Sequence, residues 1–132
     1  MSTNRDTAEL WFIKARNDLK TGKDEFITKD PATDTICFHM QQAVEKYLKG
    51  YIIYHGHEAE KTHNISRILE KCISMDLSFA ELVDAGVDNL TPYGTVIRYP
   101  DDFYIPDMQE TGDAVRLAVL VEKFIMGKLD MK

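Results

Sequence analysis

The sequence predicts an all-α protein, a single domain over residues 1–132 built as an up-and-down antiparallel bundle of four to five helices. Three observations support this prediction. Apolar residues recur at helical spacing along nearly the whole chain. Strand patterns are absent, apart from a possible extended piece at Thr95–Tyr99. A globular chain of 132 residues buries roughly two-thirds of its unfolded surface, so one core needs no metal or disulfide.

Two long helices occupy the first part of the chain. The first is expected from about Asn4 to Thr28, and the second follows Asp30-Pro31, read as an N-cap and a first-turn proline. Gly56 provides a natural stop for the second helix. Their apolar faces are formed by Ala8, Trp11, Phe12, Ala15, Leu19, Gly22 and Phe26, and by Ile36, Met40, Ala43, Val44, Tyr47, Leu48 and Tyr51.

Shorter helices follow. A third helix carries Ile65, Ile68, Leu69, Cys72 and Ile73, of which Leu69 and Ile73 are expected in the core. A fourth is expected to continue to about Asn89, with Ser78 and Glu81 as a capping box and Leu77 and Leu82 as its hydrophobic staple.

The prolines of residues 91–106 exclude a continuous helix there. The last helix begins near Asp107, with Glu110 in its first turn. Its apolar face is formed by Ala114, Leu117, Ala118, Val121, Phe124 and Ile125.

The formal net charge is −6, from 16 Lys and Arg against 22 Asp and Glu. Residues 1–72 have 11 of each sign, whereas residues 73–132 have 5 basic and 11 acidic. Phosphate affinity comes mostly from clustered Lys and Arg, so this balance argues against a generic duplex-binding protein. A small anionic ligand or one exposed stretch of RNA remains compatible with it.

Other classes are also disfavoured. The segment Met1–Asp6 is polar, so no signal peptide is predicted. No segment approaches the roughly 18 uninterrupted apolar residues of a membrane span. Cys37 and Cys72 lie within helical patterns and are too few for a disulfide framework, which predicts reduced, structural thiols. We therefore expect a cytoplasmic protein without membrane contact.

One face of the second helix is polar. His39, Gln42, Lys46 and Lys49 are spaced by 3, 4 and 3 residues and fall within an arc of roughly 80°. An imidazole, an amide and two ammonium groups in one line suit a phosphate or an acidic partner. The alternative is a solvated helix face, with Glu45 and Lys49 as an ordinary i,i+4 pair.

A second candidate is the segment Tyr93–Tyr104, in which Arg98 is the one basic residue among tyrosines and prolines. A guanidinium there suits a phosphate or an aromatic ring. The alternative is that Arg98 pairs with Asp101 or Asp102 and fixes the loop. Long loops in compact domains more often contribute to function than serve only as connections.

Metal binding is the weaker hypothesis. His55, His57 and His63 lie within nine residues, with Glu58 and Glu60 between them, but this spacing matches no standard zinc pattern. We expect a polar connection between helices, and we predict no metal and no cofactor.

Several motifs together resemble the HEPN domain family. They are Phe38–Lys49 (FHMQQAVEKYLK), Gly56, Lys61–His63 and Arg98–Pro100, and the segment Trp11–Leu19 also fits the first helix of that family. The resemblance covers nearly the whole chain. It implies a small helical bundle, commonly dimeric and often encoded with a minimal nucleotidyltransferase in toxin–antitoxin or defence pairs. It also implies nucleotide binding or, in catalytic members, metal-independent RNA cleavage.

The catalytic members carry an Arg followed about four to six residues later by a His, which act on phosphate charge and proton transfer. After Arg98 this count reaches Phe103, Tyr104 and Ile105 instead. A tyrosine with a pKa of about 10 is a poor base at neutral pH. The ribonuclease motif is therefore not found in this chain.

The leading hypothesis is a cytoplasmic HEPN protein that binds a nucleotide or single-stranded RNA, a nucleotidyltransferase partner, or both, as a homodimer in a toxin–antitoxin-like pair. The expected ligand contacts are His39, Gln42, Lys46, Lys49, Arg98 and Tyr99. One alternative is a ribonuclease toxin that uses Arg98 with Tyr104, His39 or His63. The other is a non-catalytic dimerisation or adaptor domain, in which Lys46 pairs with a buried carboxylate.

Overall fold

The computed structural model describes residues 3–94 and 104–129. The helices are α1 (Asn4–Phe26), α2 (Thr33–Tyr54), α3 (Ile65–Met75), α4 (Ala80–Asp84) and α5 (Met108–Leu129), with two 3-10 helices, η1 (Leu77–Phe79) and η2 (Val87–Gly94). These two ranges contain no strand, which confirms the all-α prediction. The possible extended piece at Thr95–Tyr99 lies outside the described residues.

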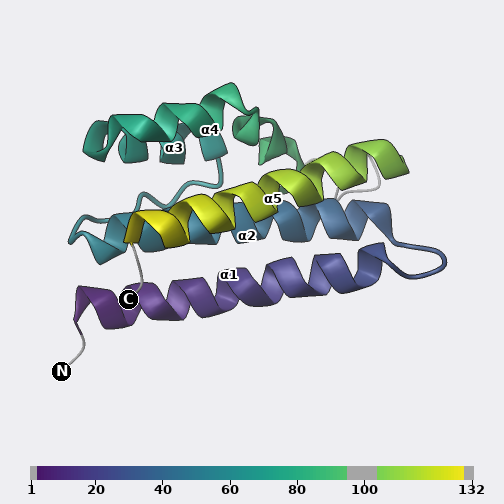
Figure 1. Ribbon diagram of the computed structural model, residues 1–132, viewed down its shortest axis with the longest axis horizontal. Helices are drawn as coiled ribbons and strands as arrows, with labels where there is room; N and C mark the ends of the chain where they lie inside the picture. Colours follow the sequence, from purple (N-terminus) through teal and green to yellow (C-terminus); the bar gives the residue numbers. More distant parts are fainter. Residues whose placement is uncertain (1–2, 95–103, 130–132) are drawn as a thin grey trace.

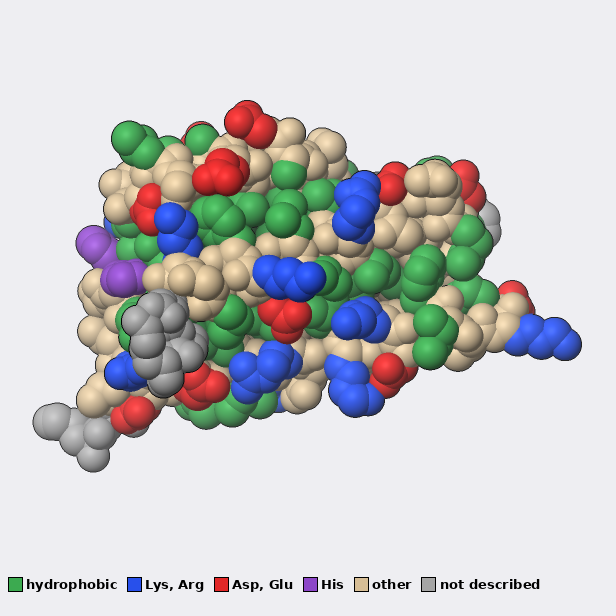
Figure 2. All heavy atoms as spheres, in the orientation of Figure 1, with side chains coloured by type: hydrophobic (Ala, Val, Ile, Leu, Met, Phe, Trp, Pro, Cys, Tyr) green, Lys and Arg blue, Asp and Glu red, His purple; other side chains and the backbone are tan. Residues whose placement is uncertain are grey.

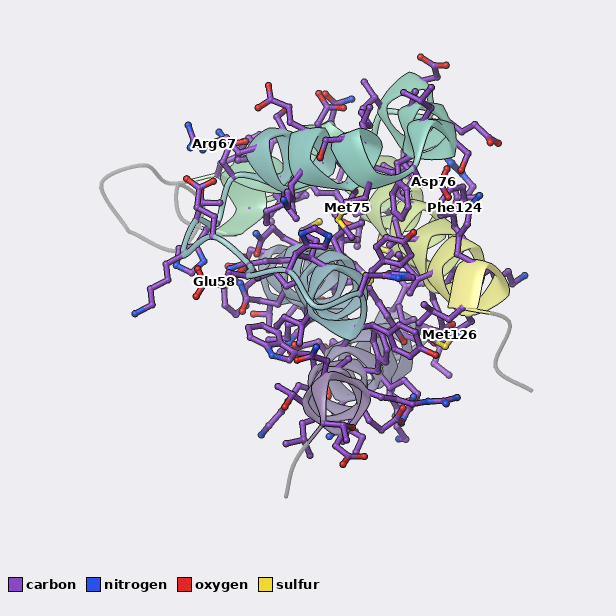
Figure 3. The ribbon with its side chains drawn as sticks, turned by 90° about the vertical axis from the view of Figure 1, so that its left-hand side faces the viewer. Glu58, Arg67, Met75, Asp76, Phe124 and Met126 are labelled. Atoms are coloured by element: carbon purple, nitrogen blue, oxygen red, sulfur yellow. The ribbon has the colours of Figure 1, made fainter. Side chains whose placement is uncertain are left out.

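The bundle is organised around α2. Helix α1 runs antiparallel along one side of it, α5 lies along another, and α3 to η2 cover a third (Figure 1). On the face in Figure 2, hydrophobic side chains fill the lines between neighbouring helices and charged ones lie on the ridges. Viewed along the bundle, α1, α2 and α3 are stacked and α5 lies to one side (Figure 3). Because α2 has neighbours on most sides, its polar residues also lie inside the protein.

Two glycines allow α1 and α2 to lie close together. A Cβ on Gly22 would be 2.1 Å from Met40 Cε, and one on Gly50 would be 2.4 Å from a ring carbon of Phe12. Since the helices are antiparallel, the two close approaches lie toward opposite ends of the pair. A Cβ at Gly50 would clash with three atoms of the Phe12 ring, whereas at Gly22 the end of the flexible Met40 side chain would have to move.

The helix faces and several ends agree with the sequence prediction. The predicted apolar residues Ala8, Phe12, Ile36 and Leu69 are completely buried or nearly so, and Ile73 is half-buried against the core. Helix α2 ends at Tyr54, and Gly56 follows with a φ of +84°, as its role as a stop requires. In the last helix the Asp107 carboxylate accepts the Glu110 N–H at 2.8 Å, close to the predicted start.

The predicted start of the second helix is wrong. Helix α2 begins after Ala32, whose side chain provides no cap, and not at Asp30-Pro31. Glu25, in the last turn of α1, reaches across the connection and accepts the Ala32 N–H at 2.9 Å. A contact between two helices therefore replaces the local cap that was expected.

The fourth helix is also shorter and capped differently from the prediction. Asp76 accepts hydrogen bonds from the Ser78 N–H at 2.9 Å and its hydroxyl at 2.7 Å, so Ser78 is a donor and not the N-cap. Leu77 is 79% exposed, so it does not form the predicted hydrophobic staple with Leu82. Helix α4 ends at Asp84, and Gly86 has a φ of +90°. The chain then continues as η2, with Pro92 inside a 3-10 helix.

Across the part of the chain that the structure describes, no helix combines the length and the apolar character needed to cross a bilayer.

Candidate functional site

The polar stripe of α2 faces α1 and the connection to α3, and two carboxylates organise it. The first is Asp18 of α1. Lys46 Nζ lies 2.5 Å from Asp18 Oδ2, and His39 Nδ1 lies 2.9 Å from Asp18 Oδ1. The Asp18 side chain is 13% exposed, and those of His39 and Lys46 are each 24% exposed. We call these three residues the Asp18 cluster.

The second carboxylate is Glu45 of α2, which is almost fully buried. Lys49 Nζ lies 2.9 Å from its Oε2, and Gln41 Nε2 donates to its Oε1 at 3.0 Å. His63 Nδ1 lies 3.1 Å from both carboxylate oxygens, and the His63 carbonyl accepts from Gln41 at 3.2 Å. Gln42 donates to Gln41 Oε1 at 2.7 Å. We call Gln41, Glu45, Lys49 and His63 the Glu45 cluster.

All four residues of the predicted stripe thus have partners within the chain. The stripe is a polar seam between elements, not a solvated face, and the expected i,i+4 pair of Glu45 and Lys49 is present but buried. In the described ranges no buried side-chain nitrogen or oxygen lacks a partner. A fully satisfied polar network of this kind holds its members in fixed positions. The charges of Lys46 and Lys49 are balanced by Asp18 and Glu45.

A groove opens where this seam meets the connection from α2 to α3. Its volume is about 850 Å³, and its lining residues are Thr7, Trp11, Lys49, Ile53, His57, Glu58, Ala59, Glu60 and Lys61. Lys49 Nζ lies 6.0 Å from the centroid of the Trp11 ring. Glu58 lies on the opposite side of α2 from Phe124 and Met126 of α5, so α5 does not cover this side (Figure 3).

A second, smaller hollow is lined by the same tryptophan. It has a volume of about 210 Å³ and is lined by Leu10, Trp11, Lys14 and Lys46. Trp11 therefore contributes to two depressions, one lined also by Lys46 of the Asp18 cluster and the other by Lys49 of the Glu45 cluster.

The three histidines of the connection have different surroundings. His57 lines the groove, His63 belongs to the Glu45 cluster, and the His55 ring lies 4.6 Å from that of Tyr51. Within the described residues, no group of three or more His, Cys, Asp or Glu is placed to hold a metal ion.

Both cysteines are buried free thiols. Burial raises the pKa of Cys37 to about 11 and that of Cys72 to about 12. Neither thiol is therefore a nucleophile at neutral pH, because the reactive form is the thiolate.

The catalytic candidates do not come together in the described part of the chain. His39 and His63 belong to different clusters. The Tyr104 hydroxyl donates to Glu110, which also accepts from Tyr93, and this hydrogen bond raises the pKa of Tyr104. Tyr104 therefore keeps its proton at neutral pH. Arg98 and Tyr99 lie outside the described residues.

Sequence inspection missed Asp18, Gln41 and Glu45 as organisers of the seam. Asp18 offered one signal: it lies three residues after Ala15 and four before Gly22, on the inward face of the first helix. Glu45 and Gln41 offered little, because nearly every face of α2 is buried and ordinary amphipathic spacing does not mark them.

Comparison with known proteins places this arrangement in a family. The model of the HEPN domain matches residues 8–129. The chain belongs to the HEPN domain family. The resemblance predicted from the Phe38–Lys49 and Lys61–His63 motifs is thereby confirmed. The matched range includes Trp11, both clusters and every lining residue of the groove except Thr7.

A solved structure is similar over nearly the full length of this HEPN protein. It is the crystal structure of TT1696 from Thermus thermophilus, which is 28% identical in sequence and has a TM-score of 0.74. The similarity covers 96% of this chain and 99% of TT1696. No curated protein matches the chain.

Proposed function

We propose that this HEPN domain binds a phosphate-bearing ligand, a nucleotide or an exposed stretch of single-stranded RNA, in the groove beside Trp11. The observation that carries the proposal is the composition of the groove. It joins Lys49 of the predicted stripe to His57 and Lys61 of the α2–α3 connection, beside an indole ring. Its volume of about 850 Å³ lies within the range of about 300–1,000 Å³ found for small-ligand sites.

The stripe supports this function in a different way from the one its charges suggest. Lys46 and Lys49 are already paired with carboxylates, so they contribute little free charge to a phosphate. Lys49 lines the groove and Lys46 lines the smaller hollow. His39 and Gln42 also have partners within the chain, Asp18 and Gln41.

Arg98 and Tyr99 are proposed as further ligand contacts on the basis of the sequence. Gly94, the last described residue before them, approaches Gln41 so closely that a Cβ would lie 2.8 Å from its side chain. Gly94 itself therefore lies beside the Glu45 cluster.

A second part of the proposal concerns partners. The membership in the HEPN family supports a cytoplasmic homodimer that pairs with a minimal nucleotidyltransferase in a toxin–antitoxin-like system. An adjacent gene for such an enzyme, and its co-purification with this protein, would support the pairing. A solitary gene whose product binds no nucleotidyltransferase would contradict it.

Calorimetric titration with ATP, GTP and a short RNA tests the binding proposal. We expect heat from at least one of them and a loss of affinity in Arg98→Ala. Arg116→Ala is the matched control, because Arg116 lies on α5 and pairs with Asp113 outside the groove. Absence of heat with all three ligands would contradict the proposal. Unchanged affinity in Arg98→Ala would show that Arg98 does not contact the ligand.

One observation favours the adaptor alternative. Lys46 is paired with a largely buried carboxylate, Asp18, as that hypothesis requires, although both residues belong to the same chain. Size-exclusion chromatography of Lys46→Ala separates the two functions. Loss of the dimer with retained ligand binding favours an adaptor, whereas a retained dimer with weaker binding favours the ligand site.

A further inference from the structure

We infer that Trp11 is a stacking platform for an unpaired nucleobase and that the two hollows beside it receive adjacent units of a single-stranded oligonucleotide. This inference rests on the proposed function and specifies its ligand. Trp11 is partly exposed and contributes to both hollows, one of about 850 Å³ and one of about 210 Å³. A mononucleotide needs only one of them, so a ligand that uses both must be longer.

The charges along the two hollows suit a nucleic-acid backbone. Lys14 borders the smaller hollow and Lys61 the larger one, and neither has a carboxylate partner among the described residues. Both ammonium groups are therefore available to phosphate oxygens. Trp11 lines both hollows, so each hollow combines an aromatic ring with a lysine that has no carboxylate partner, and rings and basic side chains together are what single strands bind.

The acidic residues of the groove predict a preference among bases. Glu60 is neutralised by an ion pair with Arg67, but Glu58 has no partner in the described ranges. A free carboxylate beside a stacked base accepts hydrogen bonds from an exocyclic amino group and repels phosphate. Adenine and cytosine carry this group and uracil does not, so we expect amino-bearing bases at Trp11.

A further hollow, lined mainly by basic and polar residues of α1, lacks an aromatic ring. It has a volume of about 420 Å³ and includes Arg16, Lys20 and Lys23. No aromatic ring lines it, Lys20 pairs with Asp24 at 2.5 Å, and Arg16 is 3.5 Å from Glu9. Figure 2 shows this face, where basic side chains along α1 and α5 alternate with acidic ones. Lys23 on this face therefore provides a matched control for Lys14 on the same helix.

The chain contains one tryptophan, so its fluorescence reports on this site alone. We would titrate the full chain with the RNA hexamers A6 and U6, ATP and inorganic tripolyphosphate, and measure indole emission together with calorimetric affinity. We expect A6 to quench Trp11 emission and to bind more tightly than U6, ATP and tripolyphosphate. Trp11→Ala is expected to weaken A6 binding by about 5- to 150-fold, whereas Trp11→Phe retains most of the affinity.

Salt dependence tests the lysines separately from the ring. Lys14→Ala and Lys61→Ala are each expected to reduce the slope of log affinity against log salt by about 0.7, because one phosphate contact is lost. Lys23→Ala is expected to leave the slope unchanged. Glu58→Gln is expected to reduce the preference for A6 over U6.

The outcomes distinguish this inference from the function on which it rests. Binding of A6 with unchanged indole emission and unaltered affinity in Trp11→Ala would overturn the stacking platform and leave the proposed function intact. Equal affinity for A6 and ATP would contradict the inference that the ligand is an oligonucleotide occupying both hollows. Absence of binding by A6, U6, ATP and tripolyphosphate would overturn both. If Trp11→Ala does not fold, two measurements still test the stacking platform. They are the quenching of indole emission in the unaltered chain and the salt dependence of A6 affinity in Lys14→Ala.

Discussion

Asp18 and Glu45 each contact one lysine and one histidine, in different surroundings, and Glu45 also accepts a hydrogen bond from Gln41. The Glu45 side chain is 6% exposed and Lys49 is 7% exposed, whereas Asp18 is 13% exposed and Lys46 is 24% exposed. Asp18 joins α1 to α2, while Glu45 pairs within α2 and holds the end of the α2–α3 connection through His63. Residue types alone therefore do not set the energetic role of a charged cluster. Burial does, because a desolvated charge without its partner is far more costly.

The largest effect is expected at Glu45. Replacing Glu45 by Ala leaves the Lys49 ammonium buried without a counter-charge and removes acceptors from Gln41 and His63. Breaking a buried pair in this way costs about 3–5 kcal/mol of unfolding free energy. Urea denaturation monitored by circular dichroism measures it.

The matched control is the double variant Glu45→Gln with Lys49→Met, in which no unpaired charge remains. We expect it to recover most of the loss, since a buried ion pair often contributes little relative to neutral residues of similar size. A cost below about 1 kcal/mol for Glu45→Ala would mean that the cluster is hydrated and that the contrast with Asp18 is wrong.

A core leucine provides the scale for that comparison. Leu69 of α3 is fully buried, and Leu69→Ala is expected to cost about 2–5 kcal/mol through lost contacts and a cavity. Leu77→Ala is the control, because that side chain is 79% exposed and such surface changes stay within about 0.5 kcal/mol. Thermal unfolding of both variants measures the difference. Similar melting temperatures for the two would show that the core does not depend on α3.

A smaller effect is expected at Asp18. Asp18→Asn removes the negative charge of the carboxylate beside Lys46 and His39, but both of these side chains reach solvent and are rehydrated. We expect a loss of about 1–3 kcal/mol, the range for hydrogen bonds to charged groups. Asp24→Asn on the same helix breaks an exposed pair with Lys20 and is expected to cost less than about 1 kcal/mol. Equal losses for Asp18→Asn and Glu45→Ala would remove the distinction between the clusters.

The sequence predicts the helix faces well, because burial at helical spacing needs no knowledge of tertiary structure. Phe12 and Ile36 illustrate this, and Gly56 shows that a backbone requirement can also be seen locally. The errors at Asp30 and Ser78 have a different origin. In each case a different carboxylate accepts a backbone N–H near the predicted helix start. Glu25 of the preceding helix accepts that of Ala32, and Asp76 accepts that of Ser78, two residues away.

The site was predicted only in part, because its organisation is tertiary. The stripe containing Lys46 and Lys49 is apparent from spacing within one helix. Its partner Asp18 comes from another helix, and no spacing rule connects the two. The larger hollow beside Trp11 depends in addition on the α2–α3 connection, whose path local propensity does not determine.

A third carboxylate, Asp76, extends the comparison to the surface and is expected to give the smallest effect. Hydrogen bonds from the Ser78 hydroxyl and N–H, and then Lys128, lower the pKa of Asp76 from 3.8 to about 2. Because the folded pKa lies below the ordinary one, the charged form stabilises the protein above about pH 4, and this stabilisation is lost as the pH falls toward 2. Asp76→Asn is therefore expected to melt at a lower temperature than the unaltered chain at pH 7.

That difference should close between about pH 4 and pH 2, because protonation then removes the same charge from the unaltered chain. Melting temperatures recorded from pH 7 down to the lowest pH at which the protein folds measure the closure. Asp84→Asn is the control: Asp84 is exposed at the end of α4 and has no hydrogen-bond partner among the described residues, so its replacement is expected to change the melting temperature little. A constant difference for Asp76→Asn at every pH would mean that the Asp76 carboxylate acts through its shape and not its charge. The graded series from Glu45 through Asp18 to Asp76 would then no longer be one of burial alone.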